Sequence, residues 1–158
     1  MEEIQQNNKT RQIVFVVISV LTVLILDQWL KFHIKTTFSL GQSKMIFSNW
    51  FELHFTENPG MAFGLELGGK WGKIVLTIFR IIASVIIIYY IKSLIKERSK
   101  TALVVLVSLI LAGALGNIID SLFYGQLFTT STYHQVAEFM PKEGGYAPLF
   151  MGKVVDMV

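Results

Sequence analysis

The sequence predicts an all-α membrane protein, a multi-pass helical bundle with a small extracytoplasmic β-rich subdomain. Of its 158 residues, 53% are hydrophobic and only 16% are charged, whereas soluble domains carry about 25% charged residues. The mean hydropathy is +0.54. The apolar residues gather into runs of about 20 residues, the length at which a helix crosses a bilayer. This composition excludes intrinsic disorder, and a chain of this length is expected to form one unit, a single integral membrane domain over residues 1–158.

Three apolar runs are expected to be membrane spans, at about residues 12–31, 71–91 and 101–119. Helices of this length cover about 30 Å of hydrocarbon at 1.5 Å per residue. The first run is followed by Asp27 and not by the small residues of a signal-peptide cleavage site. We therefore expect it to remain part of the protein as a span. The third carries small residues from Ala112 to Gly116, which favour close helix packing.

Two segments outside the spans have a different composition. Residues 33–70 mix Gly, Pro, Asn and aromatic residues and alternate roughly over 50–55, which predicts short strands with turns at Asn58-Pro59-Gly60 and Gly68-Gly69. Residues 121–153 form a second polar and aromatic stretch, expected to be an extracytoplasmic insertion. From Lys153 onward the pattern is that of the start of a strand or a helix.

Basic residues predict the topology. The connector from Lys92 to Lys100 is the densest basic cluster, and Lys9 and Arg11 precede the first span. The positive-inside rule places both in the cytoplasm, because an even number of spans separates them. The segments 33–70 and 121–153 are then extracytoplasmic. Since the basic residues flank spans and form no separate polar face, membrane lipids and not nucleic acid are the expected partners.

Acidic residues at span ends are costly and therefore need an explanation. Asp27 stands four residues before Lys31, a favourable helical ion pair that either ends the span or holds a substrate. Asn117 and Asp120 share a helical face, where they either line a cavity or cap the helix. Asp156 follows two valines, so it is either a desolvated functional carboxylate or an ordinary loop acid.

Other residues point to no metal or cofactor. The three histidines, His33, His54 and His134, stand singly without metal-ligand spacing. The chain has no cysteine, which excludes thiol catalysis and zinc–thiolate sites, and it lacks a G-x-S-x-G segment. Arg80 lies inside the second span and must reach an interface, pair with an acid or face a wet cavity.

Four segments, in order, resemble those of the bacterial lipoprotein signal peptidases, the signal peptidase II family. Asp27-Gln28-Trp29-Leu30-Lys31 is similar to D-Q-x-x-K, and Asn58 to Gly64 to N-x-G-x-A-F. Ala112 to Asp120 is similar to G-A-x-G-N-x-x-D, and Val154 to Met157 to V-V-D-F. Each segment alone is weak, but four in the right order relative to the spans are specific. The resemblance covers nearly the whole chain.

The resemblance implies a four-span protein of the bacterial cytoplasmic (inner) membrane with its active site on the extracytoplasmic side. It implies an aspartic endopeptidase that cuts prolipoproteins just before a diacylglyceryl-modified cysteine. Asp156 corresponds to one of two catalytic aspartates. Two carboxylates that share a proton can act as base and acid on one water without metal or cofactor. The positions that support the site or contact the substrate correspond to Asp27, Lys31, Asn58, Asn117 and Asp120.

Three departures from the family pattern carry expectations of their own. Ser121 stands where the family usually has Arg, which removes the charge of an ion pair there. The segment before Asp156 is longer than in most members of the family. It is either a lid over the cleft or a surface loop. The second catalytic aspartate, in an F-N-x-A-D segment that opens the fourth span, has no counterpart up to Val158. We therefore expect a fragment whose reading frame continues, and which is inactive alone.

Two other classes remain open at this stage. A small non-enzymatic transporter or channel subunit would line a polar path with Asp27, Arg80 and Asp120. It would work without Asp156. A purely structural or assembly subunit would depend on no single carboxylate.

Overall fold

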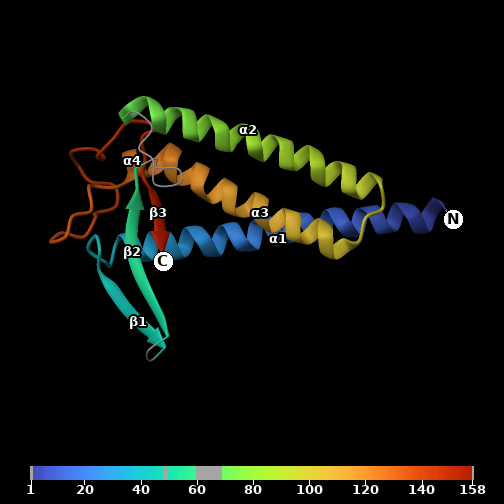
Figure 1. Cartoon of the computed structure of the whole chain (residues 1–158), viewed down its shortest axis with the longest axis horizontal. Helices are drawn as coiled ribbons and strands as arrows, with labels where there is room; N and C mark the ends of the chain where they lie inside the picture. The colour runs from blue at the N-terminus through green and yellow to red at the C-terminus, as the bar shows by residue number, and fades with distance from the viewer. Residues whose placement is uncertain (1, 48–49, 60–68, 158) are drawn as a thin grey trace. The chain divides into compact units, whose positions relative to one another are not determined.

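The computed structural model describes residues 2–47, 50–59 and 69–157. Long helices and a small sheet make up this part of the chain (Figure 1). The expected fold class, a mostly helical protein with a small β-rich part, is confirmed. The elements are α1 (Glu2–Lys35), β1 (Ser43–Phe47), β2 (Phe51–Asn58), α2 (Gly69–Lys96), α3 (Thr101–Ile119), the π-helical turn η1 (Asp120–Tyr124), α4 (Gly125–Leu127) and β3 (Val154–Met157).

Three helices among the described residues are long and apolar enough to cross a membrane, over Gln6–Lys35, Trp71–Lys96 and Thr101–Leu127. The first two extend beyond the expected spans, because the flanking polar residues continue the helix. Consequently the basic stretch from Lys92 is helical up to Lys96, and only residues 97–100 connect α2 to α3. Residues 121–127, expected as the start of a loop, are helical in η1 and α4, since their sequence contains no proline and several large apolar residues.

The chain divides into two compact units. The first contains Met1–Asp27 and Phe79–Gly116, and the second contains Gln28–Ile78 and Asn117–Val158. In the first unit, parts of α1, α2 and α3 pack around a core of Ile91, Leu94, Val104 and Leu111. Large apolar side chains on the outside of these helices, such as Ile86 and Ile110, are exposed, as lipid-facing positions require.

The second unit contains an antiparallel sheet in the order β1-β2-β3. Its third strand comes from the far end of the chain, so that Thr56 lies in register with Asp156 and Asn58 with Val154. Strand pairing thereby explains the apolar pattern after Lys153. The core between the sheet and the helices of this unit contains Ile34, Phe38, Phe55, Tyr124, Phe128, Ala137 and Val155.

The long segment before β3 is fastened to the helix that it follows. The amide of Gly152 donates to the carbonyl of Ser121 at 2.9 Å, and that of Ala147 donates to the carbonyl of Gly125 at 2.9 Å. A Cβ on Gly152 would lie 2.1 Å from the Asp120 carbonyl oxygen. Glycine is therefore required for this close approach. The segment that runs into β3 is thus held directly against η1.

Candidate active site

Polar side chains line one face of the end of α1. Gln28, Lys31 and Lys35 follow each other at spacings of three and four, which puts them on the same side of a helix. Lys31 is 3% exposed and Lys35 is fully buried. A buried ammonium group is strongly destabilising unless it is paired. This face of α1 must therefore meet acidic partners.

Asp120 is the partner at the centre of this face, and it is fully buried. Lys31 Nζ lies 2.8 Å from its Oδ2. Gln28 Nε2 donates to Oδ1 at 2.9 Å, and the backbone amide of Val155 donates to Oδ2 at 3.2 Å. Both carboxylate oxygens are thus occupied by donors. Asp120 acts as an anchor that joins α1, η1 and β3.

The residues around Asp120 complete this network. Asn117 Oδ1 accepts a hydrogen bond from Lys31 Nζ at 3.0 Å, and the Tyr124 hydroxyl donates to Gln28 Oε1 at 3.2 Å. Both come from the helical stretch that contains the π-turn, a feature that is frequent at functional sites. Ser121, at the position where an arginine was expected from the family, is buried, and its hydroxyl donates to the Asn117 carbonyl. It contributes no charge.

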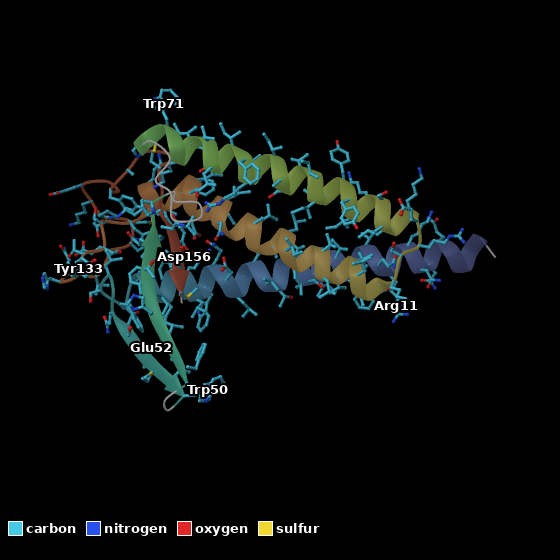
Figure 2. The ribbon with its side chains drawn as sticks, viewed as in Figure 1. Arg11, Trp50, Glu52, Trp71, Tyr133 and Asp156 are labelled. Atoms are coloured by element: carbon cyan, nitrogen blue, oxygen red, sulfur yellow. The ribbon has the colours of Figure 1, made fainter. Side chains whose placement is uncertain are left out.

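Asp156 lies on β3, directly after the residue that Asp120 holds (Figure 2). Val155 packs in the core of the unit and is 1% exposed. Successive side chains of a strand point to opposite faces, so the Asp156 side chain points away from that core. The strand thus presents the carboxylate on its other face.

The structure brings together some of the predicted site residues and leaves others apart. Lys31, Asn117 and Asp120 form one network, and Asn58 ends β2 in register with Val154. Asp27 belongs to the other unit, so its pairing with Lys31 stays a prediction. Residues 60–64 of the second family segment lie outside the described residues, as does the expected turn at Gly68.

A second buried charge cluster was not predicted from the sequence. Its centre is Glu57, whose side chain is 2% exposed and forms an ion pair with Lys35. Lys153 Nζ lies 3.1 Å from its Oε2, and the Ser131 hydroxyl donates to its Oε1 at 2.9 Å. One carboxylate therefore connects α1, β2, the inserted segment and the residue that precedes β3.

Charges, hydrogen bonds and an aromatic ring surround Glu57 and its partners, and the charges and hydrogen bonds shift the pKa of Glu57. Burial alone would raise the pKa of Glu57, but the charges of Lys35 and Lys153 and the hydrogen bonds outweigh it and hold that pKa below its ordinary value. Tyr146 accepts a hydrogen bond from the Lys153 amide at 2.6 Å, and burial raises the pKa of its phenol. The Lys35 ammonium lies 5.3 Å from the Tyr146 ring centre. The only local hint in the sequence is the spacing of Lys31 and Lys35.

The donors around Asp120 are an ammonium, an amide and a backbone N–H, which bind anions and not metals. Among the described residues, no group of three or more His, Asp or Glu side chains gathers in a way that could hold a metal ion. What the arrangement can do chemically is hold a strand bearing a carboxylate in a fixed position at the end of membrane-crossing helices.

Together, the fold and the site define a multi-pass helical membrane protein with a buried, charge-paired site between helix ends and a small sheet. The family pattern described as signal peptidase (SPase) II matches residues 19–158. The chain therefore belongs to the signal peptidase II family.

Individual relatives agree with this assignment. The chain is 48% identical over 139 residues to a lipoprotein signal peptidase of Porphyromonas gingivalis, covering 87% of this chain and 59% of the relative. It is 42% identical over 135 residues to that of Amoebophilus asiaticus, covering 85% of this chain and 52% of the relative. The chain thus spans little more than half the length of these relatives. A solved bacterial membrane enzyme is similar with a TM-score of 0.53 and 26% identity, over 88% of this chain and 76% of that one.

Proposed function

We propose that the protein to which this chain belongs is an aspartic endopeptidase that removes signal peptides from prolipoproteins, cutting before a diacylglyceryl-modified cysteine. The active site would face the extracytoplasmic side of the bacterial inner membrane. The observation that carries the proposal is the Asp120 carboxylate, which binds both Lys31 and the backbone amide of Val155. Three of the four family segments, those containing Lys31, Asp120 and Asp156, thereby meet in one unit.

The geometry supports different roles for Asp120 and Asp156. Asp120 is fully buried, and both its oxygens accept hydrogen bonds. An ammonium and two N–H donors occupy both oxygens of this carboxylate, so it is committed to holding α1 and β3 together. We assign Asp120 to positioning. Asp156, on the strand face that points away from the core, takes the catalytic role with a second carboxylate.

In this mechanism the two carboxylates share one proton. The ionised member removes a proton from a water molecule that attacks the scissile carbonyl, and the protonated member donates to the departing amide nitrogen. Asn117 accepts a hydrogen bond from Lys31, Lys31 pairs with Asp120, and Asp120 holds β3. Asn58, in register with the first residue of β3, and Asp27 are assigned to supporting the site or contacting the substrate.

The test uses the complete product of the gene, purified in detergent, with a prolipoprotein that carries a diacylglyceryl-cysteine. Asp156→Asn preserves size and removes the ionisable group. Loss of a general acid or base costs about 10²–10⁴-fold in rate, and we expect at least the lower value, measured by mass spectrometry of the released signal peptide. Glu52→Gln, an exposed acid on the same sheet (Figure 2), is the matched control and should process at the wild-type rate.

Three results would contradict the proposal. If folded Asp156→Asn retains more than about a tenth of the wild-type rate, the residue is not an acid–base catalyst. Function in cells without Asp156, together with loss of function in Asp120→Ala, would favour the alternative of a non-enzymatic transporter or channel subunit. Cleavage of an unlipidated precursor at the same rate would refute the requirement for the lipid.

A further inference from the structure

The first unit contains two adjoining cavities that the proposed peptidase activity does not use. One, of about 340 Å³, lies between the start of α1 and the turn that joins α2 to α3. The other, of about 440 Å³, runs along α1 and α2. Lys9 and Ile95 line both. A ligand in the first cavity can therefore extend directly into the second.

The smaller cavity is strongly basic. Lys9, Arg11, Arg98 and Lys100 all line it, and no acidic side chain does among those that the structure describes. Figure 2 shows Arg11 near the turn between α2 and α3. Glu97, the acid of that turn, accepts a hydrogen bond from the Ser93 hydroxyl at 2.7 Å. The cavity thus concentrates positive charge, which favours an anionic ligand.

The walls of the basic cavity are held in place by specific contacts. Gln12 is 9% exposed, and its amide donates to the Ser99 carbonyl at 2.8 Å and to the Thr101 hydroxyl at 3.3 Å. These bonds tie α1 to the turn. Thr101 begins α3 and lines the cavity, so the positive end of that helix dipole adds to the basic side chains.

Arg98 occupies a position that normally belongs to glycine. Its φ is 61°, and the amides of Arg98 and Ser99 donate to the carbonyls of Ile95 and Leu94. This is the hydrogen-bond pattern of a helix end at which glycine is preferred. A guanidinium group therefore stands at the cavity despite a strained backbone, as expected where the side chain has a function.

The larger cavity has the opposite character. Its lining is mostly aliphatic, from Ile13, Val16, Ile88, Ile91 and Leu111, with Lys92 and Lys96 also present. These apolar residues lie within candidate membrane spans. An acyl chain matches such a surface, whereas a free phosphate or a nucleotide does not.

We propose that the two cavities form a binding site for an anionic glycerophospholipid. The phosphate diester occupies the basic cavity, and an acyl chain lies in the apolar one. Basic pockets at the ends of membrane helices bind anionic headgroups in this manner. The positive-inside rule places this end at the cytoplasmic leaflet. This site is separate from the proposed peptidase activity, and its test measures lipid binding and not cleavage.

The test titrates the purified full gene product in a neutral detergent with phosphatidylglycerol or phosphatidylcholine of identical acyl chains, read by native mass spectrometry. Inorganic phosphate is the third probe, added as a competitor. The variant is Arg98→Gly with Lys100→Gln. Glycine suits the positive φ, so the fold is retained and the melting temperature should not fall. The control is Lys44→Gln with Lys142→Gln. Both lysines are exposed and belong to the other unit, and their substitution removes the same number of positive charges as the variant does.

We expect phosphatidylglycerol to bind at least about tenfold more tightly than phosphatidylcholine, and the variant to weaken that binding about 30-fold, from two lost basic contacts. The control should bind as the wild type does. Equal affinity for both lipids overturns the proposal, as does equal weakening in the control. Displacement of phosphatidylglycerol by inorganic phosphate at comparable concentration also overturns it, because the site would then bind any anion.

Discussion

Glu57 offers the sharpest test of how the second unit is held together. The substitution Glu57→Gln removes the charge but keeps the size of the side chain. Lys35, which is fully buried, and Lys153 then lose their common counter-ion. Removing one partner of a buried ion pair costs about 3–5 kcal/mol. Lys153 adds little to this value, because its side chain is 29% exposed and solvent screens it.

The expected loss can be measured by thermal unfolding in detergent at pH 7, followed by circular dichroism. For a chain of this size, 1 kcal/mol corresponds to about 2–4 °C, so Glu57→Gln should lower the melting temperature by about 6–20 °C. Glu52→Gln, on an exposed position of the same strand, should stay within about 2 °C. Equal melting temperatures of the two variants would refute the role of Glu57 as an anchor.

The same residue predicts a pH dependence. Because the pKa of Glu57 in the folded protein lies below its ordinary value of 4.5, its ion pairs stabilise the fold fully above that value. The stabilisation is lost as the pH falls through the folded pKa. The drop in melting temperature on acidification below about pH 4.5 should therefore be smaller in Glu57→Gln than in the wild type. Identical acid profiles would contradict the assignment.

Three further changes test the site from other directions. Asp120→Asn leaves Lys31 buried without its counter-charge, so both the melting temperature and the processing rate should fall; a stable variant with wild-type processing would argue against positioning by Asp120. Gly152→Ala places a Cβ 2.1 Å from the Asp120 carbonyl and should lower the melting temperature, whereas Gly113→Ala, with nothing within 4 Å, should leave it unchanged or raise it. If the two alanine variants melt alike, the close approach at Gly152 is unimportant.

The spans could be predicted from the sequence because length and hydropathy alone decide them. The length of the helices could not be predicted in this way. The polar ends of α1 and α2 continue the helix beyond the apolar run, and hydropathy does not detect helical residues that are polar. The same holds for residues 121–127. There the apolar run had ended, yet the chain continues as a π-turn and a short helix.

The sequence points to individual residues and not to the long-range contacts that the structure describes among them. Local spacing pairs Lys31 with Asp27, whereas the ion pair that the structure describes joins Lys31 to Asp120, far along the chain. Glu57 carried no signal, because its partners come from the end of α1, the inserted segment and the residue before β3. The pairing of β2 with β3 brings Glu57 close to Lys153, and that pairing is long-range.

The two anchors explain how a short strand can hold the carboxylate to which we assign catalysis. Glu57 holds Lys153 just before β3 begins, and Asp120 holds the Val155 amide within it. Both contacts, together with the buried Val155 side chain, fix the strand from its core side. Because side chains alternate along a strand, Asp156 is fixed in position by its neighbours while its own side chain points away from the core. Charge pairs that are costly to bury thus hold in place the strand that bears Asp156.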